Sequence, residues 1–356
     1  MVETSERNFT RNDMWNRNLV KRIDIEITSF CNIECSACTR VGSKDKLDKI
    51  LNNEILSYAL LKEKVRPKDF PNLEIINLCG SVDEPMSHPE IDDIIDHFSQ
   101  WRDIHLSIST NGSIRSTKWW AELGAKSKKT GRIGILWGVD GIDEVSEIYR
   151  NGSNFQKVRE NWRAYNNAGG RSTWQFIVFE HNKHQLPMLE EVAKQEGFAR
   201  TKVIYSDRPS TTNVVKVIRK NKEAASLKPS APLTIDPVVI EKEELPSIQC
   251  RYLSNGYLFI NHLGDVIPCC YFNPTHLIAH NDRRLNESGS KYIDNWKDFG
   301  GQLATNLKYN EIVDVIEGEW FTDMALSWRI DPHQLCLSKC KENKLHTMIH
   351  KDLPKE

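Results

Sequence analysis

The chain has 356 residues, of which 39% are hydrophobic and 27% are charged. This length exceeds that of a usual single domain, so one large domain and a smaller one are expected. The 48 basic and 49 acidic side chains give a net charge of −1, which argues against nucleic-acid or membrane binding through bulk charge. The longest apolar runs are too short to span a bilayer, and residues 1–7 lack the apolar core of a signal peptide.

Residues 21–205 alternate short apolar runs with longer amphipathic ones, which is the pattern of repeated β/α units. Six strands are predicted, at 22–28, 74–79, 104–109, 133–139, 174–179 and 200–204. The helices predicted between them lie at 54–64, 90–100, 117–126, 155–168 and 185–196. Six such units form either a doubly wound sheet or an incomplete barrel, and periodicity does not separate the two. In both folds the reactive loops lie at the carboxyl ends of the strands.

The remainder of the chain has a different character. Residues 206–249 are polar and rich in proline, which indicates a linker or a surface excursion. Strands at 257–260 and 265–268 flank a turn that contains Gly264, so a hairpin is predicted, and residues 285–330 look helical. The predicted organisation is an extension at 1–20, an α/β domain at 21–205, the linker at 206–249, a small hairpin and helix domain at 250–345, and a tail at 346–356.

Cys31, Cys35 and Cys38 follow the first predicted strand directly. Their Cys-x3-Cys-x2-Cys spacing offers three thiolates to one inorganic centre and leaves a fourth position open. Closed clusters and structural zinc sites normally take four protein ligands, so a 4Fe–4S cluster with one open iron is favoured and zinc is the alternative. The nine cysteines are odd in number and tightly grouped, which indicates the reducing cytoplasm rather than a secreted disulfide framework.

Further motifs follow the cysteines in a fixed order, and each lies after a predicted strand. They are Gly80-Ser81-Val82-Asp83-Glu84-Pro85, Ser109-Thr110-Asn111-Gly112, Val139-Asp140-Gly141 and Tyr149-Arg150. Together with the cysteine loop, this ensemble resembles the radical S-adenosylmethionine (SAM) superfamily over residues 21–205. The resemblance implies an α/β fold, a partial (β/α)6 TIM-like barrel. It also implies that the three cysteines hold a catalytic 4Fe–4S cluster whose open iron is chelated by the amine and carboxylate of SAM.

The turn from Gly80 to Glu84 resembles the acidic motif of this family, in which a carboxylate accepts hydrogen bonds from the SAM ammonium. Glu84 matches the acidic position. Val82 and Asp83 replace glycines of the family motif, so Asp83 either shares the role of Glu84 or displaces it. The alternative is that Glu84 merely caps a helical turn.

Three other positions are expected to contact SAM by the same resemblance. Ser109 and Asn111 match positions that bind the ribose or methionine part, although Asn111-Gly112 is also an ordinary tight turn. Asp140 lies in a segment similar to Ser-x-Asp-Gly, where Gly138 stands in place of the serine. Arg150 is expected to pair with the SAM carboxylate, because a planar guanidinium suits that task, and a solvated surface arginine is the alternative.

A second set of cysteines lies near the C-terminus. Cys250, Gly264 and Cys269 give Cys-x13-Gly-x4-Cys, and Cys336 and Cys340 add a Cys-x3-Cys pair. This spacing resembles the auxiliary-cluster module called SPASM or, in its shorter form, twitch. Four thiolates suffice for one more 4Fe–4S cluster, so the twitch form is the better match. The position of Gly264 favours Cys269 over the adjacent Cys270 as a ligand, and a four-cysteine zinc ribbon is the alternative.

The resemblance implies an enzyme that reductively cleaves SAM to a 5′-deoxyadenosyl radical and abstracts a hydrogen atom from a substrate carbon. The single auxiliary cluster and the short chain before Cys31 resemble the dehydrogenases of the twitch group. They favour a small-molecule substrate, a sugar or alcohol that is oxidised or epimerised, with the auxiliary cluster as an electron relay. A peptide- or protein-modifying maturase is the alternative, and a non-catalytic iron–sulfur or zinc module is a second one. A reducing partner such as flavodoxin or ferredoxin is expected, and no nucleic-acid or membrane partner.

Overall fold

The structure is a computed structural model that describes residues 14–42, 47–79, 81–205, 215–219, 222–227, 248–281, 291–340 and 348–353. The chain divides into two compact units. The larger one comprises residues 25–58, 75–243 and 345–356, and the smaller one residues 1–24, 59–74 and 244–344.

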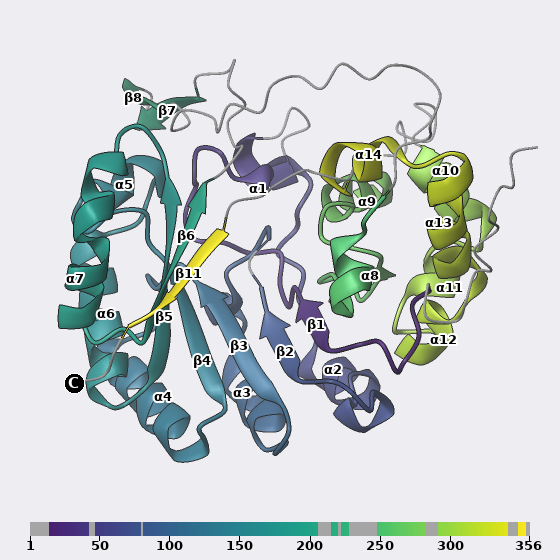
Figure 1. The fold of residues 1–356 in the computed structure, drawn as a ribbon, viewed down its shortest axis with the longest axis horizontal. Coiled ribbons are helices and arrows are strands. Elements are labelled where there is room, and N and C mark those ends of the chain that lie inside the picture. Colours follow the sequence, from purple (N-terminus) through teal and green to yellow (C-terminus); the bar gives the residue numbers. More distant parts are fainter. Residues whose placement is uncertain are drawn as a thin grey trace, which may run out of the picture. The chain divides into compact units, whose positions relative to one another are not determined.

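A mostly parallel, curved sheet forms the centre of the larger unit (Figure 1). Its strands are β1 (Arg22–Ile25, of which Ile25 belongs to this unit), β2 (Ile75–Leu78), β3 (His105–Thr110), β4 (Ile133–Gly138), β5 (Arg171–Val178) and β6 (Arg200–Tyr205). Neighbouring strands from β2 to β6 are parallel, and β11 (Met348–Asp352) pairs antiparallel with β6. The six predicted strands and the α/β partial barrel are confirmed, whereas β11 was not anticipated.

Helices alternate with these strands along the chain. In the larger unit, α3 (Ile91–Ser99), α4 (Thr117–Thr130), α6 (Phe155–Asn167) and α7 (Leu189–Gln195) cover the outer face of the sheet, with the short α1 (Thr39–Gly42) and α5 (Ser146–Tyr149) in the loops (Figure 1). Helix α2 (Tyr58–Lys64) follows β1 along the chain and, apart from Tyr58, belongs to the smaller unit. The 3-10 turns η2 (Leu47–Lys49), η3 (Pro67–Asp69), η4 (Pro85–Ser87) and η5 (Lys183–Met188) complete the connections. Local chemistry explains the ends of α4, because the Ser116 side chain caps its first turn and Gly131, at φ 66°, ends it.

Tryptophans fill the layer between sheet and helices. Trp137 of β4 packs on Trp120 of α4, with ring centroids 4.5 Å apart, and Trp174 of β5 packs on Trp162 of α6 at 4.9 Å. Buried and half-buried side chains alternate along β3 and β5, as strand geometry requires. One face of the sheet therefore packs against the helices in this aromatic core, and the alternate side chains of each strand lie on the opposite face.

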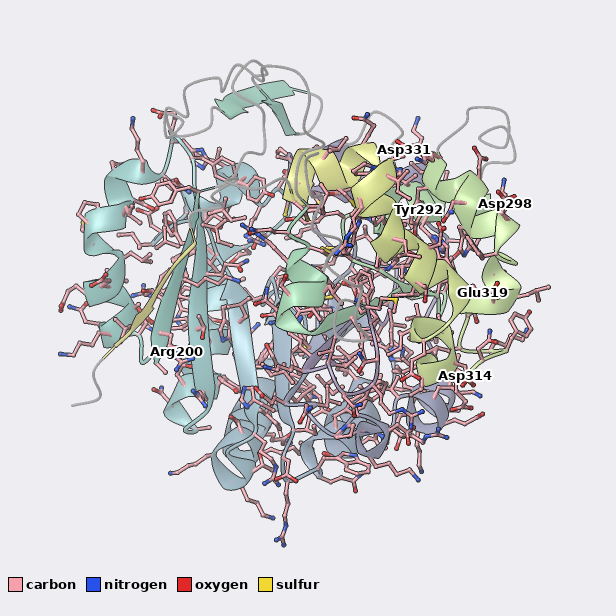
Figure 2. All side chains as sticks on the ribbon, turned by 45° about the vertical axis from the view of Figure 1, so that its right-hand side comes forward. Arg200, Tyr292, Asp298, Asp314, Glu319 and Asp331 are labelled. Carbon is pink, nitrogen blue, oxygen red and sulfur yellow. The ribbon has the colours of Figure 1, made fainter. Side chains whose placement is uncertain are left out.

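The smaller unit contains the predicted hairpin, formed by β9 (Tyr257–Ile260) and β10 (Val266–Ile267). Its helices are α8 (Arg251–Asn255), α9 (Asn273–Asn281), α10 (Lys291–Asp298), α11 (Gln302–Thr305), α12 (Ile312–Ile316), α13 (Glu319–Ile330) and α14 (Gln334–Cys340). The helical character predicted for 285–330 is confirmed from residue 291 onward. Tyr292 of α10 (Figure 2) stacks on Phe272 with ring centroids 4.1 Å apart, and its hydroxyl lies 3.3 Å from His276 Nδ1.

Most of the predicted linker at 206–249 lies outside the described residues. Its described part includes an antiparallel hairpin of β7 (Val215–Arg219) and β8 (Lys222–Leu227). Within the described ranges, no helix combines the length and the hydropathy that crossing a membrane requires.

Candidate active site

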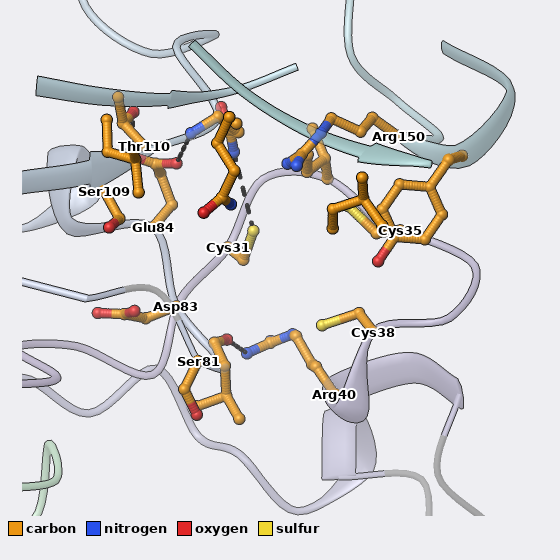
Figure 3. A pocket seen from close by; sticks show the side chains of 18 residues that line it. Cys31, Cys35, Cys38, Arg40, Ser81, Asp83, Glu84, Ser109, Thr110 and Arg150 are labelled. Carbon is orange, nitrogen blue, oxygen red and sulfur yellow. Dashed lines mark hydrogen bonds between the residues drawn. The ribbon is translucent and has the colours of Figure 1, made fainter. Parts of the chain in front are cut away.

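An open cavity with an empty volume of about 850 Å³ lies in the larger unit, bordered by the ends of β3 and β4 and the loops that follow them. The side chains of Cys31, Cys35 and Cys38 all line it (Figure 3). Asp83 and Arg150 line it as well, and Figure 3 shows Asp83 to the left of the thiols and Arg150 above them. The cavity thus brings three thiols together with acidic and basic side chains.

Backbone hydrogen bonds hold the cysteine loop in place. Glu34 N donates to Asn151 O at 2.8 Å, and Ser36 N donates to Tyr149 O at 3.1 Å. Burial and, to a smaller extent, the nearby Glu84 carboxylate raise the pKa of the Cys31 thiol to about 12. Three clustered thiols of this kind become thiolates when cationic metal is bound to them. The donor set therefore fits a cluster with three protein ligands.

Glu84 is occupied by hydrogen bonds from its own chain. It accepts bonds from Thr110 Oγ1 at 2.6 Å and from the Asn111 backbone N–H at 2.6 Å, and its side chain caps η4 through Met86 N. These bonds tie the turn after β2 to the end of β3. The carboxylate of Glu84 thus holds two loops of the site together.

Asp83, one residue earlier, is in the opposite situation. Its side chain is buried, and neither carboxylate oxygen has a hydrogen-bond partner in good geometry among the described residues. Burial raises the pKa of Asp83 well above its usual range, and the carboxylates of Glu26 and Glu84 add to this shift, while the nearby amides of Ile27 and Thr28 oppose it. A buried carboxyl group without a partner is stabilised by any cation that reaches it.

Arg150 is held at the other side of the cavity by Asp140. Asp140 Oδ2 accepts from Arg150 Nε at 2.8 Å, and Asp140 Oδ1 accepts from the Ile177 backbone N–H at 2.7 Å. Asp140 is fully buried and supports Arg150 rather than lining the cavity. Gly138 makes room for this pair, because a Cβ there would lie 2.8 Å from Arg150 Nη2.

The other residues expected at the site have different placements. Ser109 and Asn111 both line the cavity, and Asn111 Nδ2 donates to Asn32 Oδ1 at 3.0 Å. Gly80 lies outside the described residues. Sequence reasoning missed Arg40 and Gln175, which also line the cavity. Gln175 could have been found, because it alternates with buried residues of β5 and so lies on the face opposite the aromatic core.

The second set of cysteines lines a small pocket within the smaller unit. Cys250, Cys269, Cys336 and Cys340 all border it, whereas Cys270 does not. The remaining lining is largely apolar and aromatic, with Trp15, Pro268, Tyr271, Phe272, Met324, Trp328 and Leu335. The pocket has an empty volume of about 310 Å³, so it is much smaller than the first.

The thiols of this pocket influence each other. Hydrogen bonding from Cys250 lowers the pKa of Cys340 to about 6, and burial raises that of Cys336 to about 12. Among the described His, Cys, Asp and Glu side chains, no three are close enough together to bind a single metal ion. A 4Fe–4S cluster spreads its ligands over several irons, so the lining is compatible with such a cluster.

Residues 25–187 match the model of the Radical SAM superfamily. Over 107 residues the chain is 32% identical to the tungsten-containing aldehyde ferredoxin oxidoreductase cofactor-modifying protein of Pyrococcus furiosus. That match covers 29% of this chain and 27% of the relative, so it spans about a quarter of the relative's length.

Two solved structures have the same fold at low sequence identity. Streptococcus suis SuiB bound to its precursor peptide SuiA has a TM-score of 0.53 and 15% identity, with 78% of this chain and 67% of SuiB covered. The enzyme anSMEcpe with bound AdoMet and the Cp18Cys peptide has a TM-score of 0.52 and 15% identity, with 90% and 86% covered. These similarities extend the shared fold beyond residues 25–187.

Proposed function

Because residues 25–187 belong to the radical SAM superfamily, we propose that Cys31, Cys35 and Cys38 hold a catalytic 4Fe–4S cluster and that the adjoining cavity binds SAM. One observation carries the proposal. The three thiols share their cavity with the guanidinium of Arg150, which Asp140 fixes, and with the carboxyl group of Asp83, which has no hydrogen-bond partner in the part of the chain that the structure describes. These two charges complement the ammonium and the carboxylate of the methionyl part of SAM.

The contacts support separate roles for the two acidic residues of the turn. Asp83 accepts hydrogen bonds from the SAM ammonium, because the oxygens of Glu84 already bind Thr110 and Asn111. Glu84 is then a positioning residue that fixes the loops around the ligand. Arg150 pairs with the SAM carboxylate from a position that Asp140 determines.

The bound cluster and SAM supply the chemistry, in which one electron cleaves SAM to methionine and a 5′-deoxyadenosyl radical that removes a hydrogen atom from the substrate. Asp83 and Arg150 would hold the methionyl end of SAM in the cavity that the three thiols line. Ser109 and Asn111, which line the cavity near the end of β3, would contact its ribose or methionine part. The apolar side chains of Leu136 and Ile177 also line this cavity. They would limit the access of water to the 5′-deoxyadenosyl radical.

The second pocket supports a twitch-like domain with an auxiliary 4Fe–4S cluster on Cys250, Cys269, Cys336 and Cys340. A cluster with four protein ligands has no open iron, and its apolar surroundings suit an electron relay better than substrate binding. A ferredoxin or flavodoxin in a reducing cytoplasm would deliver the electrons. A zinc ribbon is the alternative at this site, and metal analysis separates the two.

For the substrate, the proposal is a small molecule, a sugar or alcohol carbon that is oxidised or epimerised. The auxiliary cluster would accept the electron that an oxidation releases. A peptide side chain is the second candidate, and it is supported by the fold relatives, whose structures hold the SuiA precursor peptide and the Cp18Cys peptide.

The decisive experiment is an anaerobic iron and sulfide analysis of reconstituted protein beside a Cys31→Ala/Cys35→Ala/Cys38→Ala variant, with SAM and dithionite added. About eight irons, falling to about four in the variant, with 5′-deoxyadenosine made only by the wild type, would support both clusters and the reaction. A Cys79→Ala control should keep all irons and full cleavage, because Cys79 does not line either pocket. Zinc in place of iron, or no cleavage under any reductant, would contradict the proposal.

The substrate class can be tested separately. A deuterated cell extract is divided into a small-molecule fraction and a peptide fraction, and each is incubated with enzyme and unlabelled SAM. Deuterium in 5′-deoxyadenosine from the first fraction alone supports the sugar or alcohol substrate. Deuterium from the peptide fraction alone would favour the maturase instead.

A further inference from the structure

A second, shallow cavity of the larger unit lies where α4 and α6 begin. These helices have 14 and 13 residues, and each follows a parallel strand, so their N-termini lie at the same end of the sheet. They pack closely, because a Cβ on Gly124 of α4 would lie 2.3 Å from the Tyr165 carbonyl of α6. The capping residues Ser116 and Asn154 both line the cavity. Two positive helix ends therefore face one space.

Side-chain charge in this cavity has the same sign as the helix ends. Arg115 and Lys157 line it, against one acidic residue, Glu160. The guanidinium of Arg115 is already positioned, since its Nε donates to Met86 O at 2.9 Å and its Nη2 to His88 O at 2.8 Å. The cavity is thus prepared for an anionic group.

Asn161 provides an independent sign of a ligand. Its side chain is only 1% exposed and lines the cavity. Its Nδ2 donates to the Gly112 carbonyl at 2.8 Å, which sets the orientation of the amide. The remaining atom, Oδ1, is buried and has no hydrogen-bond donor within the described part of the chain. A buried carbonyl oxygen without a donor is costly, so an N–H or O–H group of a bound ligand would stabilise it.

We propose that this cavity binds a phosphate group that has a hydroxyl donor beside it, either free phosphate or a phosphorylated alcohol. The helix ends, Arg115 and Lys157 bind the negative oxygens, and Asn161 Oδ1 accepts from the hydroxyl. The site shares no lining residue with the cysteine cavity, although Gly112, which Asn161 holds, directly follows Asn111 of that cavity. It is therefore a separate binding site behind the loop at the end of β3.

The test is calorimetric titration of the full-length, cluster-loaded protein at constant ionic strength with inorganic phosphate, glycerol 1-phosphate and sulfate. Sulfate has the charge but lacks the hydroxyl, so it should bind about tenfold more weakly than phosphate. Tighter binding of glycerol 1-phosphate than of phosphate would identify a phosphorylated alcohol as the ligand, and the reverse order would identify free phosphate. Equal binding of sulfate and phosphate, or no binding of either phosphate, would overturn the proposal.

Two variants sharpen the test. Lys157→Gln should weaken phosphate binding about threefold or more, whereas the matched control Lys129→Gln, at the far end of α4, should leave it unchanged. If both variants weakened phosphate binding equally, the affinity would depend only on the net charge of the protein, and the proposed site would be contradicted. Asn161→Asp should abolish binding through repulsion. If this variant does not fold, the phosphate-to-sulfate ratio and Lys157→Gln still decide.

Discussion

The two cysteine pockets differ in what surrounds the sulfur atoms. The pocket of Cys31, Cys35 and Cys38 is open and carries charged side chains, among them Asp83 and Arg150. The pocket of the four C-terminal cysteines is smaller and largely apolar and aromatic. A cavity with fixed opposite charges is suited to a zwitterionic ligand that enters and leaves, whereas an apolar lining keeps water and ligands away from a resident centre.

The comparison shows that thiol number and lining change together. Three thiols leave one coordination position open, and in this pocket the buried Asp83 carboxyl group has no hydrogen-bond partner among the described residues. Four thiols complete a cluster, and there the lining offers little polar surface for a further ligand. The side chains around the cysteines are thus as informative about function as the cysteine spacing.

The largest effect is expected from Asp83→Asn. Loss of the negative charge should raise the SAM dissociation constant about 10- to 100-fold, because a hydrogen-bonded charge pair is lost. Without SAM, the variant should be at least as stable as the wild type, because asparagine carries no cost of ionising a buried group near the carboxylates of Glu26 and Glu84. Calorimetry and thermal unfolding measure the two quantities.

Glu84→Gln is the matched control for Asp83→Asn. It weakens the bonds to Thr110 and Asn111, so the melting temperature should fall. If Glu84→Gln left stability intact and weakened SAM binding more than Asp83→Asn did, the two roles would be reversed.

A smaller effect is expected from Gly138→Ala. The new methyl group would meet Arg150 Nη2 at 2.8 Å and displace the guanidinium, so SAM affinity should fall about tenfold, with about 1–3 kcal/mol lost in unfolding free energy. Gly134→Ala is the control on the same strand, because its methyl group would meet His105 Nε2 at 2.9 Å instead. Equal SAM affinities of the two variants would contradict the assignment of Arg150 to the ligand.

Stability of the SAM-free protein should depend on pH through Asp83. The pKa of this carboxyl group is raised in the folded state above its ordinary 3.8, so the folded chain holds a proton that the unfolded chain releases. The free energy of unfolding should therefore fall as pH rises from about 4 through the raised pKa, opposite in sign to a salt-bridged carboxylate. Denaturant titrations between about pH 5 and 8 should show this slope reduced in Asp83→Asn and reduced by SAM. Identical slopes for the SAM-free wild type, the wild type with SAM and Asp83→Asn would contradict the titration of Asp83.

The smallest effect is expected from Cys270→Ala, which should leave iron content and SAM cleavage unchanged because Cys270 does not line the second pocket. Cys269→Ala should lose about four irons, since it would remove one of the four proposed ligands of the second cluster. Iron analysis of the two variants checks this. Loss of iron in Cys270→Ala alone would show that Cys270, and not Cys269, is the ligand.

Local patterns were enough to predict much of the fold. The six strands and the 257–268 hairpin follow from alternating apolar residues and turn chemistry, which need no knowledge of distant contacts. Strand β11 was missed because Met348–Asp352 has no such pattern, and its pairing with β6 joins positions about 150 residues apart. Edge pairing of this kind depends on tertiary structure.

The candidate site was predictable only in part. The cysteine loop and Arg150 were found through motif spacing, and all of them line the cavity. The different states of Asp83 and Glu84 could not be predicted, because they depend on where Thr110 and Asn111 lie when β3 ends beside the turn. That juxtaposition links residues 26 and 27 positions apart through the sheet.

The hydrogen bond between Asp140 and Ile177 makes the position of Arg150 depend on the register of β4 and β5. One oxygen of Asp140 is bound to a backbone amide of β5 and the other to Arg150. A shift of one residue between β4 and β5 would present the wrong amide, free Asp140 and let the guanidinium move. A chain misaligned in this way would keep a normal content of strand and helix but, if Arg150 binds SAM as proposed, would bind SAM more weakly. Loss of SAM affinity at normal secondary-structure content would therefore report a misaligned β4–β5 pair.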